Sequence, residues 1–145
     1  STAVEKYSQE AADKCVPLDS ELIKEAIPLF TQIHHCGSVL AEVFFAMMIS
    51  RILYGSVPAP GTMVIFSILL ATCSIGTPGL PWGTVMVSLG TLTGILKFGD
   101  SGMALMFAVF ALNDAFAAAC NATCDGAAAL FLTGYVKRHD FSNRL

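Results

Sequence analysis

Apolar and polar residues alternate along the chain in blocks, not evenly. A charged start, residues 1–21, precedes three long apolar stretches at residues 22–54, 61–96 and 102–136. Neither charge nor histidine occurs between residues 52 and 96. Blocks this apolar are typical of helices in a bilayer, where about 20 residues cross the hydrocarbon core. The pattern predicts an all-α membrane protein with several spanning or membrane-embedded helices.

The first apolar stretch, residues 22–54, carries two interruptions. Pro28 is expected to interrupt it early, because proline removes a helical hydrogen bond. The polar run His34-His35-Cys36-Gly37-Ser38 interrupts it again. The part after this run is about 16 residues, barely enough to span a bilayer alone. We therefore predict one transmembrane helix that is broken near residues 34–38.

The second stretch, residues 61–96, consists of two short apolar arms around a tip rich in glycine and proline. The arms at residues 62–73 and 84–96 are each about 18–20 Å long as helices. Neither crosses a core of about 30 Å. Irregular backbone at membrane depth survives only when it is buried in protein or lines a cavity. The stretch predicts a re-entrant helical hairpin, and the alternative is one long kinked helix.

The third stretch, residues 102–136, predicts a final transmembrane helix. Lys137, Arg138 and His139 follow it, and Arg144 adds a further charge. Positive charges flank membrane helices mainly on the cytoplasmic side. We therefore expect the C-terminus to be cytoplasmic in a multi-pass protein of a cell membrane, either a plasma membrane or a bacterial-type inner membrane.

Composition supports membrane insertion and excludes several functions. Hydrophobic residues make up 54% of the chain and charged residues 13%, with a mean hydropathy of +0.66. Soluble domains carry about a quarter charged residues. The net charge of −3 and the absence of a basic aromatic stripe argue against nucleic acid as a partner. No arrangement of a nucleophile with a base and no phosphate-binding loop is present, so we expect no enzyme.

The last apolar stretch holds the most informative polar residues. Asp114, Asn121 and Asp125 are spaced so that all three share one face of a helix. Alanines surround them, and small residues allow close helix contact in membranes. Because carboxylates are costly inside a bilayer, this stripe indicates a cation site or a polar pathway. The alternative is that these side chains only pair with residues elsewhere in the protein.

Glu42 is a further acidic residue in an apolar stretch, one turn after the predicted helix break. It is a candidate for binding a proton or a cation, and the alternative is an ion pair with Arg51. Broken helices matter here because their free N–H and C=O groups bind substrates and ions in secondary transporters.

A zinc or copper site using His34, His35 and Cys36, or Cys120 and Cys124, is a weaker alternative. Adjacent histidines point to different faces of a helix. We accordingly expect no cofactor other than a sodium ion.

Three motifs resemble the sodium:dicarboxylate (glutamate transporter-like) symporter family. Residues 74–81, Ser-Ile-Gly-Thr-Pro-Gly-Leu-Pro, are similar to the family's SIGTAGVP-type hairpin tip. Residues 121–126, Asn-Ala-Thr-Cys-Asp-Gly, follow Asp114 as NVTGDA does in the family. Residues 27–42 align without gaps to the run LPLGATINMDGTALYE. The resemblance covers nearly the whole chain in the family's order.

The resemblance implies roles for individual residues. Sodium would bind near the hairpin tip and at a deeper site, where backbone of residues 29–33 contributes. The implied sodium ligands are Ser74, Ile75, Thr77, Asn121 and Asp125. The implied substrate contacts are Ser38, Gly79, Leu80, Asp114 and Asn121, with Asp114 holding the substrate's amino group. Glu42 and His34 are the candidates for proton or ion coupling.

The sequence also departs from the family pattern. The family's NMDGT is replaced by His34-His35-Cys36-Gly37-Ser38, and its carboxylate-binding arginine falls at Ala117. A neutral amino acid therefore fits better than an acidic dicarboxylate.

By this resemblance the chain is the C-terminal part of a transport domain, and residues 1–21 are the end of a first hairpin and a cytoplasmic link. The family implies a scaffold domain or subunit and a homotrimer.

The leading hypothesis is secondary active transport of a small amino acid or carboxylate, coupled to sodium or another cation. The alternative is a membrane interaction protein without transport, or a degenerate fragment of such a transporter.

Overall fold

The computed structural model describes residues 2–14, 20–75 and 83–139, and in these ranges the chain is helical, without strands. The helices are α1 (Thr2–Asp13), α2 (Ser20–Ile33), α3 (Cys36–Tyr54), α4 (Pro60–Ile75), α5 (Gly83–Gly94) and α6 (Asp100–Arg138). Two stretches, Glu21–Tyr54 and Asp100–Arg138, are long and apolar enough to cross a bilayer. The predicted all-α membrane protein is thereby confirmed.

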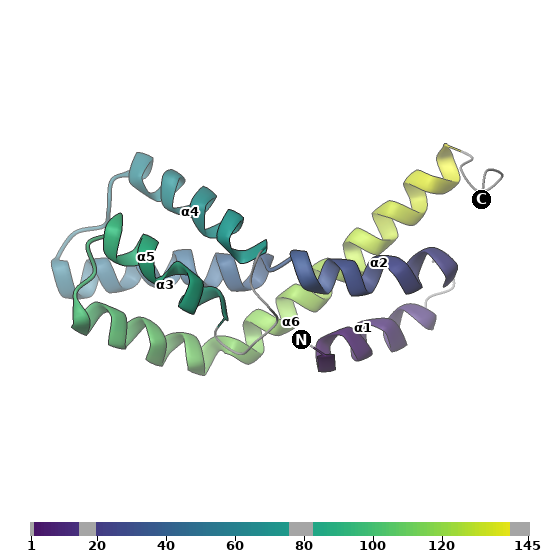
Figure 1. Cartoon of the computed structure of the whole chain (residues 1–145), viewed down its shortest axis with the longest axis horizontal. Helices are drawn as coiled ribbons and strands as arrows, with labels where there is room; N and C mark the ends of the chain where they lie inside the picture. Colours follow the sequence, from purple (N-terminus) through teal and green to yellow (C-terminus); the bar gives the residue numbers. More distant parts are fainter. Residues whose placement is uncertain (1, 15–19, 76–82, 140–145) are drawn as a thin grey trace.

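The first of these stretches is broken, as predicted. Helix α2 ends at Ile33 and α3 begins at Cys36, so His34 and His35 link two helices. Residues 36–38 already belong to α3, and the break is therefore narrower than the polar run suggested. In Figure 1, α2 and α3 follow one another along the length of the molecule.

Pro28 does not interrupt the helix in which it lies, contrary to the prediction. It lies inside α2, which continues to Ile33. Proline inside a membrane helix is tolerated where nearby groups satisfy the backbone. The Thr31 hydroxyl donates a hydrogen bond to the carbonyl of Pro28 itself at 3.0 Å, which does not replace the N–H that proline lacks.

Helices α4 and α5 lie side by side and run in opposite directions (Figure 1). Their buried residues recur every three or four positions, which places them on one face of each helix: Met63, Phe66, Leu70 and Ser74 on α4, and Thr84, Val85, Ser88 and Leu92 on α5. This packing excludes one continuous helix through residues 61–96. Re-entry of the pair into a membrane stays a prediction, and residues 76–82 of its tip lie outside the described residues.

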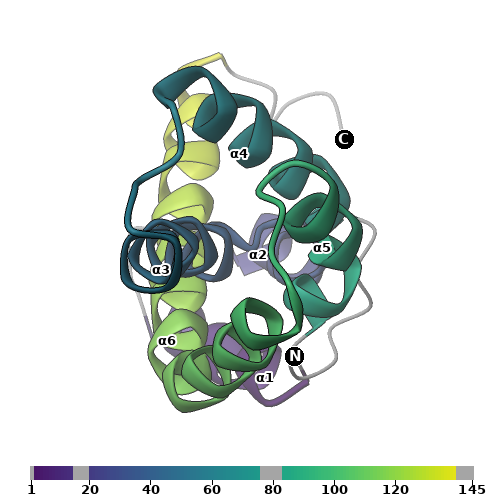
Figure 2. The same cartoon turned by 90° about the vertical axis from the view of Figure 1, so that its left-hand side faces the viewer.

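The main core lies where α3, α4, α5 and the first half of α6 meet (Figure 2). Phe66, Leu70, Val85, Leu92 and Met106 are fully buried there. Large apolar residues are also exposed: on α6, Leu112, Phe131 and Phe116 are 83%, 78% and 71% exposed. Exposed apolar side chains in such numbers fit contact with lipid or another protein.

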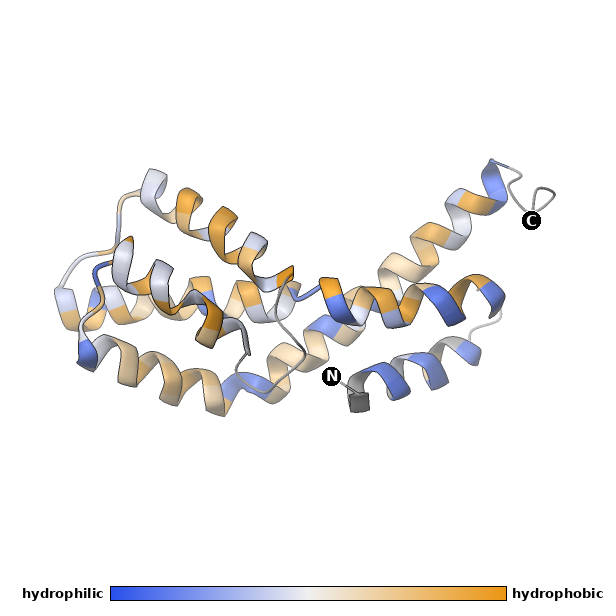
Figure 3. Ribbon diagram, in the orientation of Figure 1, coloured by the Kyte–Doolittle hydropathy of each residue, from blue (hydrophilic) through white to orange (hydrophobic). Residues whose placement is uncertain are grey.

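Helix α1 differs in character from the rest. Figure 3 shows hydrophilic residues over most of α1, whereas apolar residues dominate α3, α4, α5 and α6. Helix α1 packs against α2 and α6.

At the far end of the molecule, the Tyr54 hydroxyl accepts a hydrogen bond from the Gly99 N–H at 3.0 Å. This contact ties the end of α3 to the start of α6. The two longest helices are therefore fixed to each other at that end and along their shared face.

Candidate functional site at the helix break

The break between α2 and α3 lies directly against α6. Gly37 makes this approach possible, because a Cβ at that position would lie 2.5 Å from Cys120 Cβ and 2.6 Å from the Ala117 carbonyl oxygen. Any side chain would force the two helices apart. The family-like polar run therefore contains a glycine where α3 and α6 are in closest contact.

Asn121 of α6 binds the first turn of α3. Its Oδ1 accepts a hydrogen bond from the Gly37 N–H at 2.7 Å, and its Nδ2 donates to Ser38 Oγ at 3.1 Å. The first N–H groups of a helix have no partner within the helix. Asn121 satisfies one of them and fixes the position of Ser38. Ser38 and Asn121, both predicted to contact substrate, are thus brought together, and in this structure they are hydrogen-bonded to each other.

Asp125 lies one turn further along α6 and is fully buried. Its Oδ1 is 3.0 Å from His34 Nδ1, so an imidazole at the break pairs with a carboxylate 91 residues away. Its Oδ2 has no hydrogen-bond partner among the described residues. A buried carboxylate oxygen without a partner is unfavourable inside a membrane protein and is suited to a cation.

One oxygen of Asp125 therefore pairs within the protein, as the alternative reading of the acidic residues of α6 expected. Asp114 is half-buried on the same stripe, but it precedes Asp125 by 11 residues, about 16 Å along the helix. The stripe predicted from the spacing does not become a single cluster: Asn121 and Asp125 lie at the break, and Asp114 lies three turns away.

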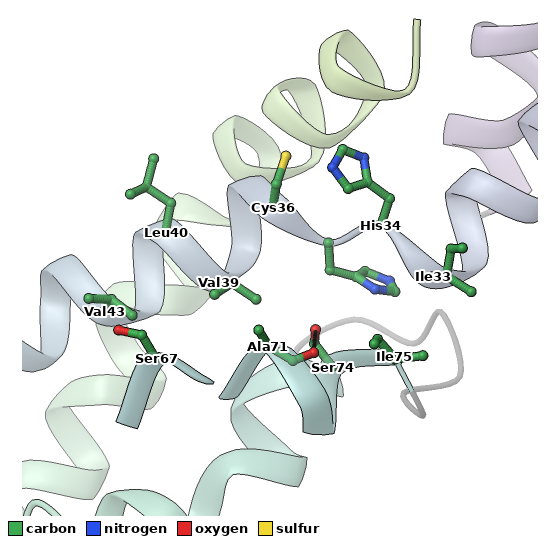
Figure 4. Close-up of a pocket in the computed structure, with 11 residues that line it drawn as sticks. Ile33, His34, Cys36, Val39, Leu40, Val43, Ser67, Ala71, Ser74 and Ile75 are labelled. Carbon is green, nitrogen blue, oxygen red and sulfur yellow. Dashed lines mark hydrogen bonds between the residues drawn. The ribbon is translucent and has the colours of Figure 1, made fainter. Parts of the chain in front are cut away.

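A pocket of about 490 Å³ opens on the other side of the break, between α3 and α4 (Figure 4). Its walls are mostly apolar, which is typical of sites for small molecules. The lining residues are Ile33, His34, His35, Cys36, Val39, Leu40, Val43, Ser67, Ala71, Ser74 and Ile75.

Three predicted site residues, His34, Ser74 and Ile75, line this pocket. The Ser74 hydroxyl donates to the Ala71 carbonyl at 2.8 Å. Ser38 on α3 and Asn121 on α6 contact each other away from this pocket, and His34 connects the two regions because it lines the pocket and pairs with Asp125. The predicted Thr77, Gly79 and Leu80 lie outside the described residues.

His35, which the sequence analysis named as a candidate metal ligand, also lies at the break. It lines the pocket, and its buried Nδ1 has no hydrogen-bond partner in the described part of the chain. The signal was its place in a polar run between two apolar helices. Residues 34 and 35 are not helical, and the two adjacent imidazoles differ: His34 Nδ1 is paired with Asp125, whereas His35 Nδ1 has no partner among the described residues.

Glu42 is fully buried between α3 and α5. Its Oε1 is hydrogen-bonded to the Ser88 hydroxyl, and its Oε2 has no partner in the described ranges. The alternative pairing with Arg51 is wrong, because Arg51 Nη1 donates to the Gly55 carbonyl at 2.5 Å near the end of α3. Glu42 therefore joins the broken helix to an arm of the hairpin.

The weaker metal alternative gains no support. Over residues 2–14, 20–75 and 83–139, no three histidine, cysteine or acidic side chains come together as a group able to hold a metal ion. His34, one of the candidate ligands, is bound to Asp125 instead.

Comparison with known proteins identifies the family of this arrangement. The sequence profile described as the Sodium:dicarboxylate symporter family matches residues 7–134, which include the helix break, both arms of the hairpin and the polar stripe of α6. No curated protein and no solved structure matches the chain.

Proposed function

Because this chain belongs to the sodium:dicarboxylate symporter family, we propose that it is the substrate- and ion-binding part of a secondary active transporter. The family implies cation-coupled transport across a membrane, not an enzymatic reaction. The observation that carries the proposal is Asp125: a fully buried carboxylate at a helix break, with one oxygen bound to His34 and the other without a partner in the described residues.

Sodium is the proposed coupling ion. Asp125 Oδ2 supplies negative charge for it, and Asn121, one turn earlier on α6, binds the first turn of α3. Sodium prefers oxygen ligands, and carbonyl groups freed at a helix break provide more of them. Ser74 and Ile75 on the wall of the pocket, with Thr77 of the tip, form the second proposed sodium site.

The proposed substrate is a small amino acid or a related carboxylate. The proposed contacts are Ser38, Gly79, Leu80, Asp114 and Asn121. Ala117 supports a neutral substrate: it is buried against α3 and itself carries no charge to bind a second carboxylate.

Glu42 and His34 are the proposed coupling residues. The Ser88 hydroxyl lies within hydrogen-bonding distance of both Glu42 Oε1 and the Val85 carbonyl, yet a serine carries one hydroxyl proton. A protonated Glu42 would donate to Ser88 and free the serine proton for Val85. Movement of α5 away from α3 would expose the carboxyl group and release its proton.

We also propose which surroundings the protein contacts and how it is oriented in the membrane. The exposed apolar side chains of α3 and α6 fit contact with the bilayer and with a scaffold domain or subunit, which the family resemblance places in a homotrimer. Lys137 and Arg138 in the last turn of α6 support a cytoplasmic C-terminus in a cell membrane.

The test is the thermal stability of the detergent-purified full chain, with and without sodium, across neutral amino acids and dicarboxylates. A ligand that binds only the folded state raises the melting temperature. We expect a sodium-dependent rise with a small neutral amino acid, and loss of this rise in Asp125→Asn. Asp100→Asn, which removes an exposed acid from the same helix, is the matched control and should retain it.

A second function is favoured by one observation. His34 already binds Asp125, and both polar ends of Asn121 are occupied, as expected of a membrane interaction protein that no longer transports. A folded chain whose melting temperature responds to no cation and no substrate would contradict the transport proposal and support this second function.

A further inference from the structure

A groove of about 430 Å³ lies between α3 and α6, in addition to the pocket beside α4. Its lining residues recur every three or four positions, so each helix presents one face to the groove. Leu40 and Phe44 of α3 and Phe116 of α6 line it, and all three are more than half exposed. The groove therefore opens to the surroundings of the protein. Both helices belong to the stretches that are long and apolar enough to cross a bilayer.

The dimensions of the groove suit a hydrocarbon chain. On α6 it extends from Asn113 to Cys120, which is about 10 Å along the helix. A volume of about 430 Å³ over this length gives a cross-section of about 40 Å². A helix with its side chains is about 10–12 Å across, which corresponds to about 80 Å² or more. The groove is thus too narrow to take up a further helix.

The chemistry of the groove selects an uncharged ligand. None of the described residues that line it is charged, so a carboxylate or phosphate there would be removed from water without a cation. Asn113 adds an amide, which is half-buried and makes no hydrogen bond with the described residues. An amide both donates and accepts hydrogen bonds. It therefore fits a hydroxyl or a carbonyl group.

We propose that the groove binds a neutral lipid, whose hydrocarbon chain lies between α3 and α6 and whose hydroxyl or carbonyl group is hydrogen-bonded to Asn113. The floor of the groove includes Gly37 and Cys120, where α3 and α6 are in closest contact. The bound lipid contacts both helices beside the helix break. Because it binds only where the two helices are packed, it raises the melting temperature of the chain.

Tryptophan fluorescence of the full chain in detergent tests the proposal. Trp82, the single tryptophan of the sequence, is replaced by phenylalanine, and Phe116→Trp places a tryptophan at the groove. The probe is stearyl alcohol brominated in the middle of its chain, because bromine quenches tryptophan on close contact. We expect quenching that saturates as the alcohol is added and that unbrominated stearyl alcohol reverses. The brominated carboxylate of the same length should bind more weakly.

Two further substitutions test the groove itself. Asn113→Leu removes the hydrogen bond and should weaken binding of the alcohol by about 2- to 10-fold, the effect of one such bond. Ala41→Leu adds a larger side chain to the lining and should also weaken the saturable quenching. Circular dichroism checks that each variant is folded, and either variant alone suffices if the other does not fold.

Phe131→Trp, in the same background without Trp82, is the matched control. Position 131 is 78% exposed on the same helix but does not line the groove. Its quenching should increase in proportion to the alcohol, without saturation. Equal, non-saturating quenching at positions 116 and 131 would overturn the proposal and make the groove an ordinary lipid-facing surface. Protection of position 116 from both probes in a dimeric chain would overturn it in favour of a second helix. The readout does not depend on transport.

Discussion

At the scale of single residues, Gly37 decides how closely the broken helix approaches α6. Replacement by alanine places a methyl group against the Ala117 carbonyl, which is backbone and cannot rotate away. Overpacking of this kind typically costs about 1–3 kcal/mol. We expect Gly37→Ala to lower the melting temperature and to weaken the hydrogen bond from the Gly37 N–H to Asn121.

Gly90 on α5 offers the matched control, because an added Cβ there meets no atom within 4 Å. Alanine favours helix over glycine by up to about 1 kcal/mol. Gly90→Ala should therefore be neutral or stabilising. Equal melting temperatures for Gly37→Ala and the unsubstituted chain would contradict the close contact of α3 with α6.

His34 provides a second prediction at this scale, on the cation site. His34→Ala removes the imidazole from Asp125 and leaves both oxygens of a buried carboxylate without a partner. Such a loss costs about 1–3 kcal/mol or more for a charged group. We expect a lower melting temperature in sodium-free buffer, and a larger sodium-induced rise than in the unsubstituted chain because Oδ1 becomes available.

The control for this prediction is His139→Ala, which removes an exposed histidine at the end of α6 and should change neither value strongly. A variant of His34 that unfolds earlier yet gains nothing from sodium would show that Asp125 serves the fold alone. The sodium response thus distinguishes a cation site from an internal pair.

At the scale of helices, the hydrogen bond between Glu42 and Ser88 holds an arm of the hairpin against the broken helix. Ser88→Ala leaves the buried Glu42 carboxyl without its partner, at a cost of about 1–3 kcal/mol. We expect a lower melting temperature and faster hydrogen exchange in α5, because α5 loses its polar contact with α3.

Ser67→Ala is the matched substitution on the other arm, since the hydrogen bond of the Ser67 hydroxyl within the described residues goes to the Met63 carbonyl of its own helix at 2.7 Å. Its effect on stability should be small. If both serine variants lower stability equally, the loss would reflect the hydroxyl groups in general and not the contact between α3 and α5.

The helices themselves were largely predictable from the sequence, because their signals are local. Apolar length, the polar run at residues 34–38 and the glycine-proline tip depend on neighbours in the chain. Pro28 was misjudged because a helix that packs against others can continue through a proline, and the packing of α2 on α1 and α6 is not apparent from the residue pattern.

The candidate site was less predictable, because it depends on contacts between residues far apart in sequence. The spacing of Asp114, Asn121 and Asp125 correctly placed them along one helix, but not which of them meets the break. The pair of His34 with Asp125 joins positions 91 residues apart. That pair, and the contact of Asn121 with Ser38, become apparent only from the packing of α3 on α6. Gly37 permits this packing.

At the scale of the whole molecule, the length of α6 allows its orientation across the membrane to be tested. Its 39 residues extend about 58 Å, well beyond a hydrocarbon core of about 30 Å. Lys97, in the turn before α6, and Lys137, in its last turn, therefore lie on opposite sides of the membrane if α6 spans it. A cytoplasmic C-terminus requires Lys137 on the cytoplasmic side.

Trypsin added to sealed membrane vesicles tests this orientation, because it cleaves after lysine only on the side it can reach. We expect cleavage after Lys137 in inside-out vesicles and after Lys97, which is exposed, in right-side-out vesicles. The reverse result would place the C-terminus outside. Cleavage at both lysines from one side would mean that α6 does not cross the bilayer, and the buried Asp125 would then lack the membrane setting that a coupled transport site requires.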